Sequence, residues 1–463
     1  MKRILTFTLA LLALCSFGAE ARKVSGTVAC GGSGIKDVIV TDGTHFTTTG
    51  RKGTYKLEIS DDARFVFVVT PKGFTADYSS GTTKYYQSVS TRKSVYDFTL
   101  KTTAKTGDYK LFAVSDPQLK TEEHFEQFRA EPLAVLAKDV DKAVAEGYNV
   151  AVVSLGDEGW DNLPLMEKYQ NEMKRINAPV YNIMGNHDFD RYKQGLENQL
   201  GFEERFGPAN YAFFLGTDLV ICLKDIIYDT DKKYDEGYTK EEIRFVKRLL
   251  KKVSKKTHVY ICQHSPVYIL SDYFKGENPW IQNSRKMLRA VKGHKVDFIS
   301  GHTHVFNNFQ YRKRVYEHNI ASICGAFWNS IYCQDGTPRG YLVLSGNKGY
   351  NEWKYRTIDF AENHQMEVFG LGECPEYPES IVANIWDYDE EWAVVWYQDG
   401  KKMGGMTQVK ATSPKATPLG NALINNHFFA VTPSEDAQVV TIVASNRFGD
   451  EWRVEVDAIR TKE

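Results

Sequence analysis

The sequence lacks an excess of either charge, because 58 lysine and arginine residues nearly balance 59 aspartate and glutamate residues. This balance provides no strongly basic field for nucleic acid, and the chain has no acidic tail. After residue 21 there is no apolar run long enough to span a bilayer. None of the seven cysteines shows C-x-x-C spacing, which argues against a structural zinc knuckle. We therefore expect no transmembrane segment and no nucleic-acid partner.

The N-terminal segment, MKRILTFTLALLALCSFGAEA, starts with two basic residues and continues with an apolar core. An A-x-A cleavage site follows and ends at Ala21. This order predicts a signal peptide over residues 1–21 and a secreted or periplasmic protein. A lipoprotein anchored at Cys15 is an alternative, although Leu14 stands where a small residue is expected.

A basic run, KRLLKKVSKK from Lys247 to Lys256, suggests nucleic-acid binding at first sight. Apolar residues recur through this region at helical spacing, namely Ile243, Val246, Leu249, Leu250 and Val253. The pattern predicts an amphipathic helix whose cations lie on its solvated face. Thr239 and Glu242 have the spacing of a capping box at its start.

Three folded regions follow the predicted signal peptide. Residues 22–105 contain short alternating or β-branched runs between turn residues, which predict an N-terminal β-sandwich domain. In residues 108–372, strands alternate with helices near Phe125–Glu146 and Leu163–Ile176, which indicates a layered α/β core. The Gly- and Pro-rich segment 371–380 predicts a second boundary, and residues 378–463 form a predicted C-terminal β domain.

Five predicted strands of the α/β region end on side chains that can bind metal ions. These side chains are Asp116 and Gln118, Asp157, Asn186 and His187, His264, and His302 and His304. Ligands bind at the carboxyl ends of strands in α/β sheets. Oxygen and imidazole ligands without thiolate favour Mn, Fe, Zn or similar divalent ions. The set exceeds the needs of one ion, so we predict two neighbouring ions that share Asp157.

In this order the motifs resemble those of the calcineurin-like metallophosphoesterase family. The family pattern is D-x-H, G-D, G-N-H-[D/E], a lone His and G-H-x-H. The matching segments are Asp116-Pro117-Gln118, Gly156-Asp157, Gly185-Asn186-His187-Asp188, His264 and Gly301-His302-Thr303-His304. The resemblance covers about residues 108–370 and implies a β-sandwich core flanked by helices. The flanking regions look like the immunoglobulin-like N-terminal domain and the C-terminal β domain of exported bacterial members.

The resemblance also implies roles for these residues. Asp116 and His304 would hold a first ion, Asp157 would bridge, and Asn186, His264 and His302 would hold a second ion. His187 would face the substrate phosphate and its leaving oxygen as a catalytic residue. Asp188 would fix the loop or orient His187, and it joins His187 in the predicted catalytic group.

Two residues depart from the pattern of known relatives. Gln118 replaces the histidine of D-x-H, so we expect either a weaker first-ion ligand or a partner of an ion-bound water. Trp160 stands where purple acid phosphatases carry tyrosine three residues after the bridging aspartate, so no ferric-tyrosinate colour is expected. Asp161, next in the chain, is expected to cap a loop rather than bind an ion.

The sequence therefore predicts an exported, metal-dependent hydrolase of phosphate mono- or diesters. It would use two divalent ions, Mn, Fe, Zn or Mg, with a bridging hydroxide, on a small-molecule or lipid phosphate ester. The alternative is a binding protein without catalysis, in which Gln118 marks a degenerate site and the β domains bind a glycan or envelope component. The sequence predicts neither the natural substrate nor the oligomeric state.

Aromatic residues in two loops are candidates for substrate selection. Phe327, Trp328, Tyr332 and Tyr273 are predicted to line a pocket, with core or interface packing as the alternative. Arg339 is a candidate phosphate ligand, with an ordinary surface position as the alternative.

Overall fold

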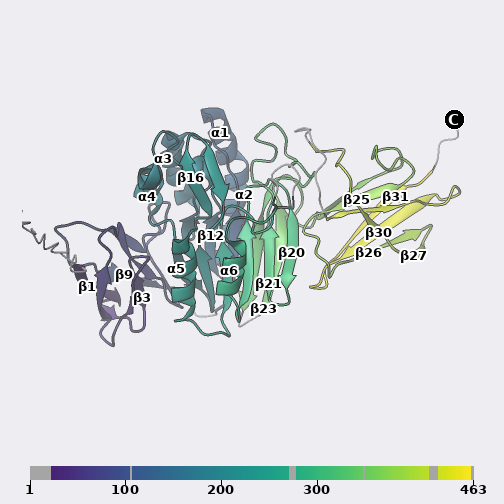
Figure 1. Cartoon of the computed structure of the whole chain (residues 1–463). Helices are drawn as coiled ribbons and strands as arrows, with labels where there is room; N and C mark the ends of the chain where they lie inside the picture. The colour runs from purple at the N-terminus through teal and green to yellow at the C-terminus, as the bar shows by residue number, and fades with distance from the viewer. Residues whose placement is uncertain (1–21, 105–106, 271–277, 348–349, 417–425, 460–463) are drawn as a thin grey trace, which may run out of the picture.

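The computed structural model describes residues 22–104, 107–270, 278–347, 350–416 and 426–459. These residues form two β-rich regions with an α/β region between them (Figure 1). Our predictions for the signal peptide, Cys15 and Tyr273 lie outside the described residues. Within those residues, no helix combines the length and apolarity needed to cross a bilayer.

The N-terminal region consists of short strands in two main sheets. One has the order β2-β1-β5, with β9 pairing to β1, and the other has the order β4-β3-β6-β8. Side chains of the fifth strand, TYKLEI, alternate between exposed and buried, so the sheet has one core face. The strands are β1 (Arg22–Cys30), β2 (Ser33–Gly34), β3 (Ile39–Thr41), β4 (Phe46–Thr48), β5 (Thr54–Ile59), β6 (Phe65–Val69), β7 (Phe74–Thr75), β8 (Tyr86–Ser88), β9 (Phe98–Thr99) and β10 (Lys101–Thr102).

The central region contains two larger sheets, with orders β13-β12-β11-β22-β23 and β14-β15-β18-β19-β21-β20. Its first elements are β11 (Tyr109–Val114), α1 (Glu122–Ala130), α2 (Pro132–Ala145), β12 (Asn149–Ser154), α3 (Leu163–Glu172), η1 (Met173–Arg175), β13 (Val180–Asn182), η2 (Asn186–Asp188), η3 (Gly195–Gln199) and α4 (Leu200–Phe206). Then come β14 (Tyr211–Leu215), β15 (Asp218–Cys222), β16 (Ile226–Thr230), β17 (Lys233–Glu236), α5 (Lys240–Leu250), β18 (His258–Cys262), α6 (Ser284–Ala290), β19 (Lys295–Ser300), β20 (Asn307–Arg312), β21 (Val315–Asn319), β22 (Gly340–Asn347) and β23 (Tyr350–Thr357).

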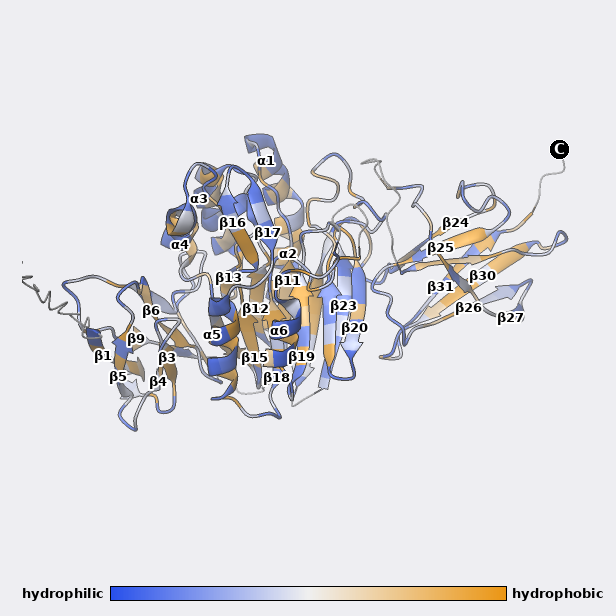
Figure 2. Ribbon diagram, in the orientation of Figure 1, coloured by the Kyte–Doolittle hydropathy of each residue, from blue (hydrophilic) through white to orange (hydrophobic). Residues whose placement is uncertain are grey.

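Strands β12, β15 and β18 are buried on both faces, which explains their continuous apolar runs. Leu111 and Ala113 of β11 belong to the core that includes residues of the second sheet, whereas Phe112 and Val114 face helices α1 to α3. Helices α5 and α6 pack on the other sheet, with their apolar side turned inward (Figure 2). The predicted capping box is present, since Glu242 accepts a hydrogen bond from the backbone amide of Thr239 at 2.8 Å.

The helix predicted over Phe125–Glu146 is two helices in the structure. Helix α1 ends at Ala130, and Pro132 begins α2. Proline lacks the amide that an uninterrupted helix needs but fits the first helical turn, so the break falls at Glu131.

The C-terminal region contains two four-stranded sheets, with orders β24-β25-β29-β28 and β27-β26-β30-β31. Its strands are β24 (Met366–Phe369), β25 (Ile381–Ile385), β26 (Ala393–Gln398), β27 (Lys401–Gly405), β28 (Thr407–Val409), β29 (Phe428–Val431), β30 (Val439–Ser445) and β31 (Glu451–Asp457). Because β24 pairs with β25, the C-terminal sheets already begin at Met366, before the predicted boundary segment 371–380. The predicted fold class, an α/β core between two β-rich regions, is confirmed.

Candidate metal centre

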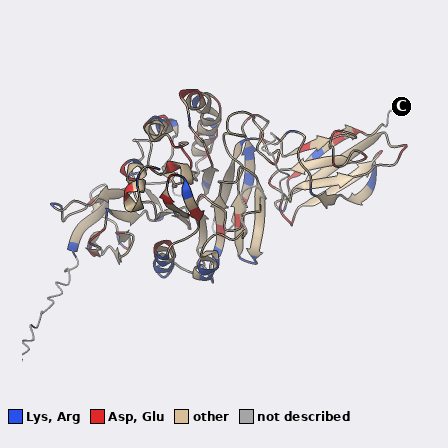
Figure 3. Cartoon of the chain, turned by 45° about the horizontal axis from the view of Figure 1, so that its top comes forward, with Lys and Arg blue, Asp and Glu red and all other residues tan. Residues whose placement is uncertain are grey.

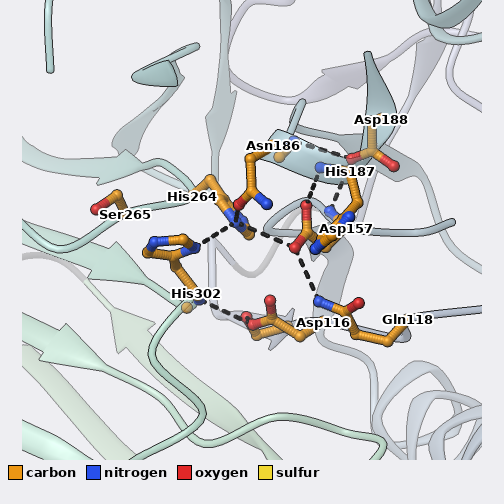
Figure 4. A network of polar contacts seen from close by, with 12 residues as sticks. Asp116, Gln118, Asp157, Asn186, His187, Asp188, His264, Ser265 and His302 are labelled. Atoms are coloured by element: carbon orange, nitrogen blue, oxygen red, sulfur yellow. Dashed lines mark hydrogen bonds and ion pairs between the residues drawn. The ribbon is translucent and has the colours of Figure 1, made fainter. Parts of the chain in front are cut away.

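Five loops that follow parallel strands bring the predicted ligands together (Figure 4). Strands β11, β12 and β13 are parallel neighbours in one sheet, and β18 and β19 are parallel neighbours in the other. Parallel strands present their carboxyl ends at the same edge, so the polar residues after each strand meet there. All seven predicted metal ligands are buried: Asp116, Gln118, Asp157, Asn186, His264, His302 and His304.

Four donor atoms converge in the histidine-rich half of the centre. His264 Nε2 lies 3.0 Å from Asn186 Oδ1, 3.1 Å from His302 Nδ1 and 3.5 Å from Asp157 Oδ2. Ligand atoms of Asp157, His264 and His302 all lie within 4.8 Å of one another. This spacing is close enough for one cation to contact them together.

Asp116, Gln118 and His304 form the amide-containing half. His304 Nε2 lies 3.4 Å from Asp116 Oδ1, and the Gln118 amide nitrogen lies 3.5 Å from the same His304 nitrogen. The Gln118 amide also donates to Asp157 Oδ2 at 2.8 Å. Asp157 Oδ2 therefore contacts both halves.

Backbone and side-chain contacts aim the ligand atoms inward. His264 Nδ1 lies 2.9 Å from the Leu155 carbonyl oxygen, so it serves as the donor and Nε2 carries the lone pair toward the centre. His302 Nε2 lies 3.3 Å from Glu236 Oε1, which leaves Nδ1 as its inward ligand atom. Asp157 uses Oδ1 to accept from the His187 amide at 2.8 Å, so Oδ2 points inward.

Asp116 is divided in the same way, since its Oδ2 accepts from the His302 amide at 2.9 Å. Its Oδ1 and the Gln118 carbonyl oxygen are buried without a hydrogen-bond partner among the described residues. Unpartnered buried oxygens are costly unless something compensates them. Carboxylate, amide and imidazole donors suit divalent cations, so this residue set fits metal ions.

The buried carboxylates of Asp116 and Asp157 make the electrostatic potential at His264 negative. Burial raises the pKa of Asp157, but His264 and His187 outweigh that effect and lower it. Burial lowers the pKa of His264, but Asp157 and Asp116 outweigh it and raise that pKa to about 10. The same carboxylates that hold a proton on His264 attract a cation in its place.

The His187 side chain lies at the rim and pairs with Asp161. His187 Nδ1 is 3.1 Å from Asp161 Oδ1, and Asp161 also forms an ion pair with Lys232. Burial raises the pKa of Asp161, but hydrogen bonds from His187 and Lys232 lower it to about 2. The expectation that Asp161 caps a loop was therefore wrong, because its carboxylate orients His187 instead.

Asp188 holds the loop that contains Asn186 and His187 in place, which is one of the two roles expected for it. Its Oδ2 accepts from the amides of Asp157 at 2.7 Å and Gly185 at 2.9 Å, and its Oδ1 accepts from Gly159 at 3.2 Å. These bonds hold the loop of Asp157 against the loop of Asn186. The side-chain partner of His187 is Asp161. The second role expected for Asp188, orienting His187, therefore belongs to Asp161.

Glycines of the motifs permit the close packing of these loops. A Cβ at Gly301 would lie 1.5 Å from Ser115 Oγ, and one at Gly185 would lie 2.2 Å from Asp157 Oδ1. A side chain at either position would displace a ligand loop, which explains why glycine occurs there.

Several non-glycine residues of the centre have a left-handed backbone, with φ between 50° and 69°. They are Asp116, Gln118, Asp157, Asp161, His302, His304, Phe327 and Trp328. Residues with a Cβ adopt this conformation at a cost on the order of 1 kcal/mol each. Such strain gathers at functional sites, where it aims side chains that a relaxed loop would not.

The three described aromatic candidates occupy different environments. Phe327 lies at the rim, with its ring 4.5 Å from that of His304 and 4.9 Å from that of Trp160. Trp328 points away and donates to the carbonyl of Pro117 at 3.0 Å, so it supports the loop of Gln118. Tyr332 packs against Phe360, in the loop after the central sheet.

Arg339 is neither a phosphate ligand nor a surface residue. Its guanidinium is buried and binds both oxygens of Asp359, at 2.7 and 2.9 Å, and Glu131 at 2.6 Å. Neither the phosphate-ligand nor the surface expectation holds, because Arg339 is buried in ion pairs with two carboxylates. These partners lie far from it in sequence, so no local pattern reveals them.

Sequence reasoning did not identify two supporting carboxylates. Glu236, at the end of the β16–β17 hairpin, contacts His302, and Asp225 accepts from the amides of His264 at 3.0 Å and Ser265 at 2.8 Å. Neither residue belongs to a motif, so only the tertiary structure reveals them.

Models of one protein family match nearly the whole chain. The N terminal of calcineurin-like phosphoesterase matches residues 22–111, calcineurin-like phosphoesterase matches residues 109–306, and the C terminal of calcineurin-like phosphoesterase matches residues 317–452. No curated protein matches the chain significantly.

Solved structures show a more distant similarity. A dimetal phosphatase from Danio rerio is 13% identical, with a TM-score of 0.36, and covers 53% of this chain and 98% of its own. A purple acid phosphatase from yellow lupin (Lupinus luteus) seeds is 9% identical, with a TM-score of 0.43, and covers 70% of this chain and 67% of its own. A 5'-nucleotidase from Candida albicans is 9% identical, with a TM-score of 0.36, and covers 56% of this chain and 52% of its own.

The three family models follow the described fold in order, from the N-terminal β region through the α/β core to the C-terminal sheets. The protein belongs to the calcineurin-like phosphoesterase family.

Proposed function

We propose that the protein hydrolyses phosphate esters with the help of two divalent cations. Asn186, His264 and His302 would hold one ion, Asp116 and His304 would hold the other, and Asp157 would contact both. The observation that carries this assignment is the position of Asp157 Oδ2, 3.5 Å from His264 Nε2 and 2.8 Å from the Gln118 amide. Gln118 would contribute only a neutral amide group to the site of Asp116 and His304.

When bound, the cations would neutralise the phosphoryl oxygens and supply an activated water as nucleophile. The ligand loops would hold the phosphate in a fixed orientation, since their backbone positions are set by Asp188 and by close glycine contacts. His187 would meet the leaving oxygen, because its side chain remains partly accessible, at 19%, whereas those of His264, His302 and His304 are at most 4% exposed.

Asp161 supports the proposed role of His187. An acceptor at Nδ1 fixes the ring and favours a proton on that nitrogen, so Nε2 is the atom available for proton exchange with the leaving group. General-acid assistance of this kind typically contributes roughly 10²–10⁴-fold to the rate. A small-molecule or lipid phosphate ester is the proposed substrate class, and export of the chain remains our proposal from residues 1–21.

Metal removal and reconstitution test the proposal. The purified protein is treated with a chelator, dialysed, and reloaded with Mn²⁺, Zn²⁺, Fe²⁺ or Mg²⁺, and the hydrolysis of chromogenic phosphate mono- and diesters is followed. We expect activity to disappear with the metal and to return when about two ions per chain are bound. A fully loaded protein that hydrolyses neither ester class would support the alternative, a metal-containing binding protein.

A further inference from the structure

The outer side of helices α5 and α6 carries a dense group of cations. Eight exposed lysine and arginine residues lie on α5 and the turn after it, four on α6 and the turn after it, and three at the turn between β20 and β21. We call these residues the cationic face: Lys240, Arg244, Lys247, Arg248, Lys251, Lys252, Lys255 and Lys256; Arg285, Lys286, Arg289 and Lys292; and Arg312, Lys313 and Arg314.

The three segments lie side by side on the same surface. Lys255 Nζ lies 3.5 Å from the carbonyl oxygen of Lys292, and Arg312 donates to the carbonyl of Leu288, in α6, at 2.5 Å. Figure 3 shows the two helices nearly end-on at the lower edge of the central region, with blue residues over them. The cations therefore form one continuous surface rather than three separate groups.

No carboxylate within the described residues forms an ion pair with the cationic face. Elsewhere on the surface, Lys168 pairs with Glu122 at 2.6 Å and Lys101 with Asp77 at 2.9 Å. Of the two acidic residues on α5, only Glu241 is exposed, because Glu242 is buried in the capping box. At the edge of the face, Arg244 and Arg248 share a cavity with Asp42 and Asp62 of the N-terminal region.

Helix stability does not explain this arrangement. Lys247 and Lys251, and Arg248 and Lys252, are four residues apart, a spacing at which like charges oppose helix formation. Burial, together with nearby Lys255 and Arg314, also lowers the pKa of His294 beneath the face. An external anion would relieve this repulsion.

The densest part of the cationic face is remote from the metal centre. The turns that contain Lys255 and Lys292 precede β18 and β19, whereas His264 and His302 follow the same strands. Strands of five and six residues span roughly 17–20 Å. Over that distance, exposed charges are largely screened at physiological ionic strength, where the Debye length is about 8 Å.

We propose that the cationic face docks the protein on an anionic lipid membrane, with the metal centre turned away from the lipid. The cations cover a broad surface formed by two helices and a turn, which matches a two-dimensional array of phosphate headgroups. Among the described residues, no exposed large apolar side chain lies in these segments, so the contact is electrostatic and requires no insertion.

A nucleic acid is the less favoured partner for the same surface. Single-stranded nucleic acid binds to exposed aromatic rings as well as cations, and sequence-specific recognition of a duplex requires an element that enters a groove. The aromatic residue of α5, Phe245, is buried, and the two helices lie flat against the sheet.

Vesicle co-sedimentation of the full chain tests the proposal. Vesicles with about one-third anionic phospholipid are compared with purely zwitterionic vesicles, at low ionic strength and near 0.5 M salt. We expect binding to anionic vesicles alone and loss of binding at high salt. Insertion of the apolar N-terminal segment depends on neither anionic lipid nor salt, so the amount bound to zwitterionic vesicles measures it, and only the excess bound to anionic vesicles is assigned to the cationic face.

Matched charge reversals locate the binding surface. Lys251→Glu, Lys255→Glu, Lys292→Glu and Lys313→Glu in one variant should weaken binding to anionic vesicles at least about tenfold. The control variant, Lys36→Glu, Lys56→Glu, Lys401→Glu and Lys402→Glu, changes net charge equally at exposed lysines elsewhere and should retain most of the binding. Unfolding temperature and hydrolytic activity, measured for both variants, establish that the fold is intact.

Three results would overturn the proposal. The first is equal binding to both vesicle types, and the second is an equal loss in the control variant. The third is tighter binding to duplex or single-stranded DNA than to anionic vesicles, which would identify nucleic acid as the partner. Activity on phosphate esters is independent of all three, so the proposed function stands or fails separately.

Discussion

The two halves of the metal centre share Asp157 but differ in what surrounds their donors. In the histidine-rich half, His264 and His302 each have a partner on the outer ring nitrogen, Leu155 and Glu236. In the amide-containing half, the outer ring nitrogen of His304, Nδ1, is buried without a hydrogen-bond partner among the described residues, and Gln118 offers only a neutral amide. Preorganised imidazoles bind a divalent ion more tightly than a neutral amide oxygen does. We therefore expect sequential filling, with the histidine-rich half filled first.

Removing the shared ligand should have the largest effect because it breaks both halves. Asp157→Asn keeps the shape of the side chain but removes the charge that either ion requires. We expect hydrolysis to fall by more than about 10³-fold and the metal content to drop below one ion per chain. Steady-state kinetics and elemental analysis measure these changes. Asp229→Asn, at an exposed position of the nearby hairpin, is the control and should leave both values unchanged.

A change at His187 should separate chemistry from ion binding. His187→Ala is expected to lower kcat by roughly 10²–10⁴-fold while both halves keep their ions. Asp161→Asn should lower kcat less, because the ring remains but loses its oriented partner. The loss should also shrink on esters whose leaving groups need no proton. Unchanged kcat on poor leaving groups in His187→Ala would remove this residue from the mechanism.

Glu236→Gln should weaken only the histidine-rich half. Loss of a carboxylate partner behind a metal-bound histidine typically costs about 10–100-fold in metal affinity. Competition with a coloured chelator measures the two binding steps separately. We expect the affinity of the tighter binding step to fall toward that of the weaker step. If the weaker step moves instead, the order of filling given above is reversed.

Gln118→His should produce the smallest change and in the opposite direction. An imidazole would replace the amide in the amide-containing half, and we expect the weaker step to tighten by roughly tenfold. The same chelator competition tests this outcome, with Gln118→Ala as the control that removes the side chain altogether. Equal affinities in the three proteins would show that Gln118 contacts neither ion.

The sequence predicted the layered fold because the apolar runs of the strands and the polar residues at their ends are local signals. It also predicted the convergence of Asp116, Asp157, His264, His302 and His304, since parallel strands end at one edge of a sheet. It did not predict Glu236 behind His302, because that contact depends on how the β16–β17 hairpin folds over the edge. The role of Asp161 was missed for a similar reason, since its left-handed backbone turns the carboxylate toward His187.

The left-handed backbone at Asp116, Asp157, His302 and His304 limits which residues could replace them. Among residues with a Cβ, aspartate, asparagine and histidine adopt this conformation several times more often than average, whereas a β-branched residue is an outlier there. The same short list of side chains supplies the oxygen and imidazole ligands that divalent ions accept. Loop geometry and coordination chemistry therefore select the same residue types at these four positions.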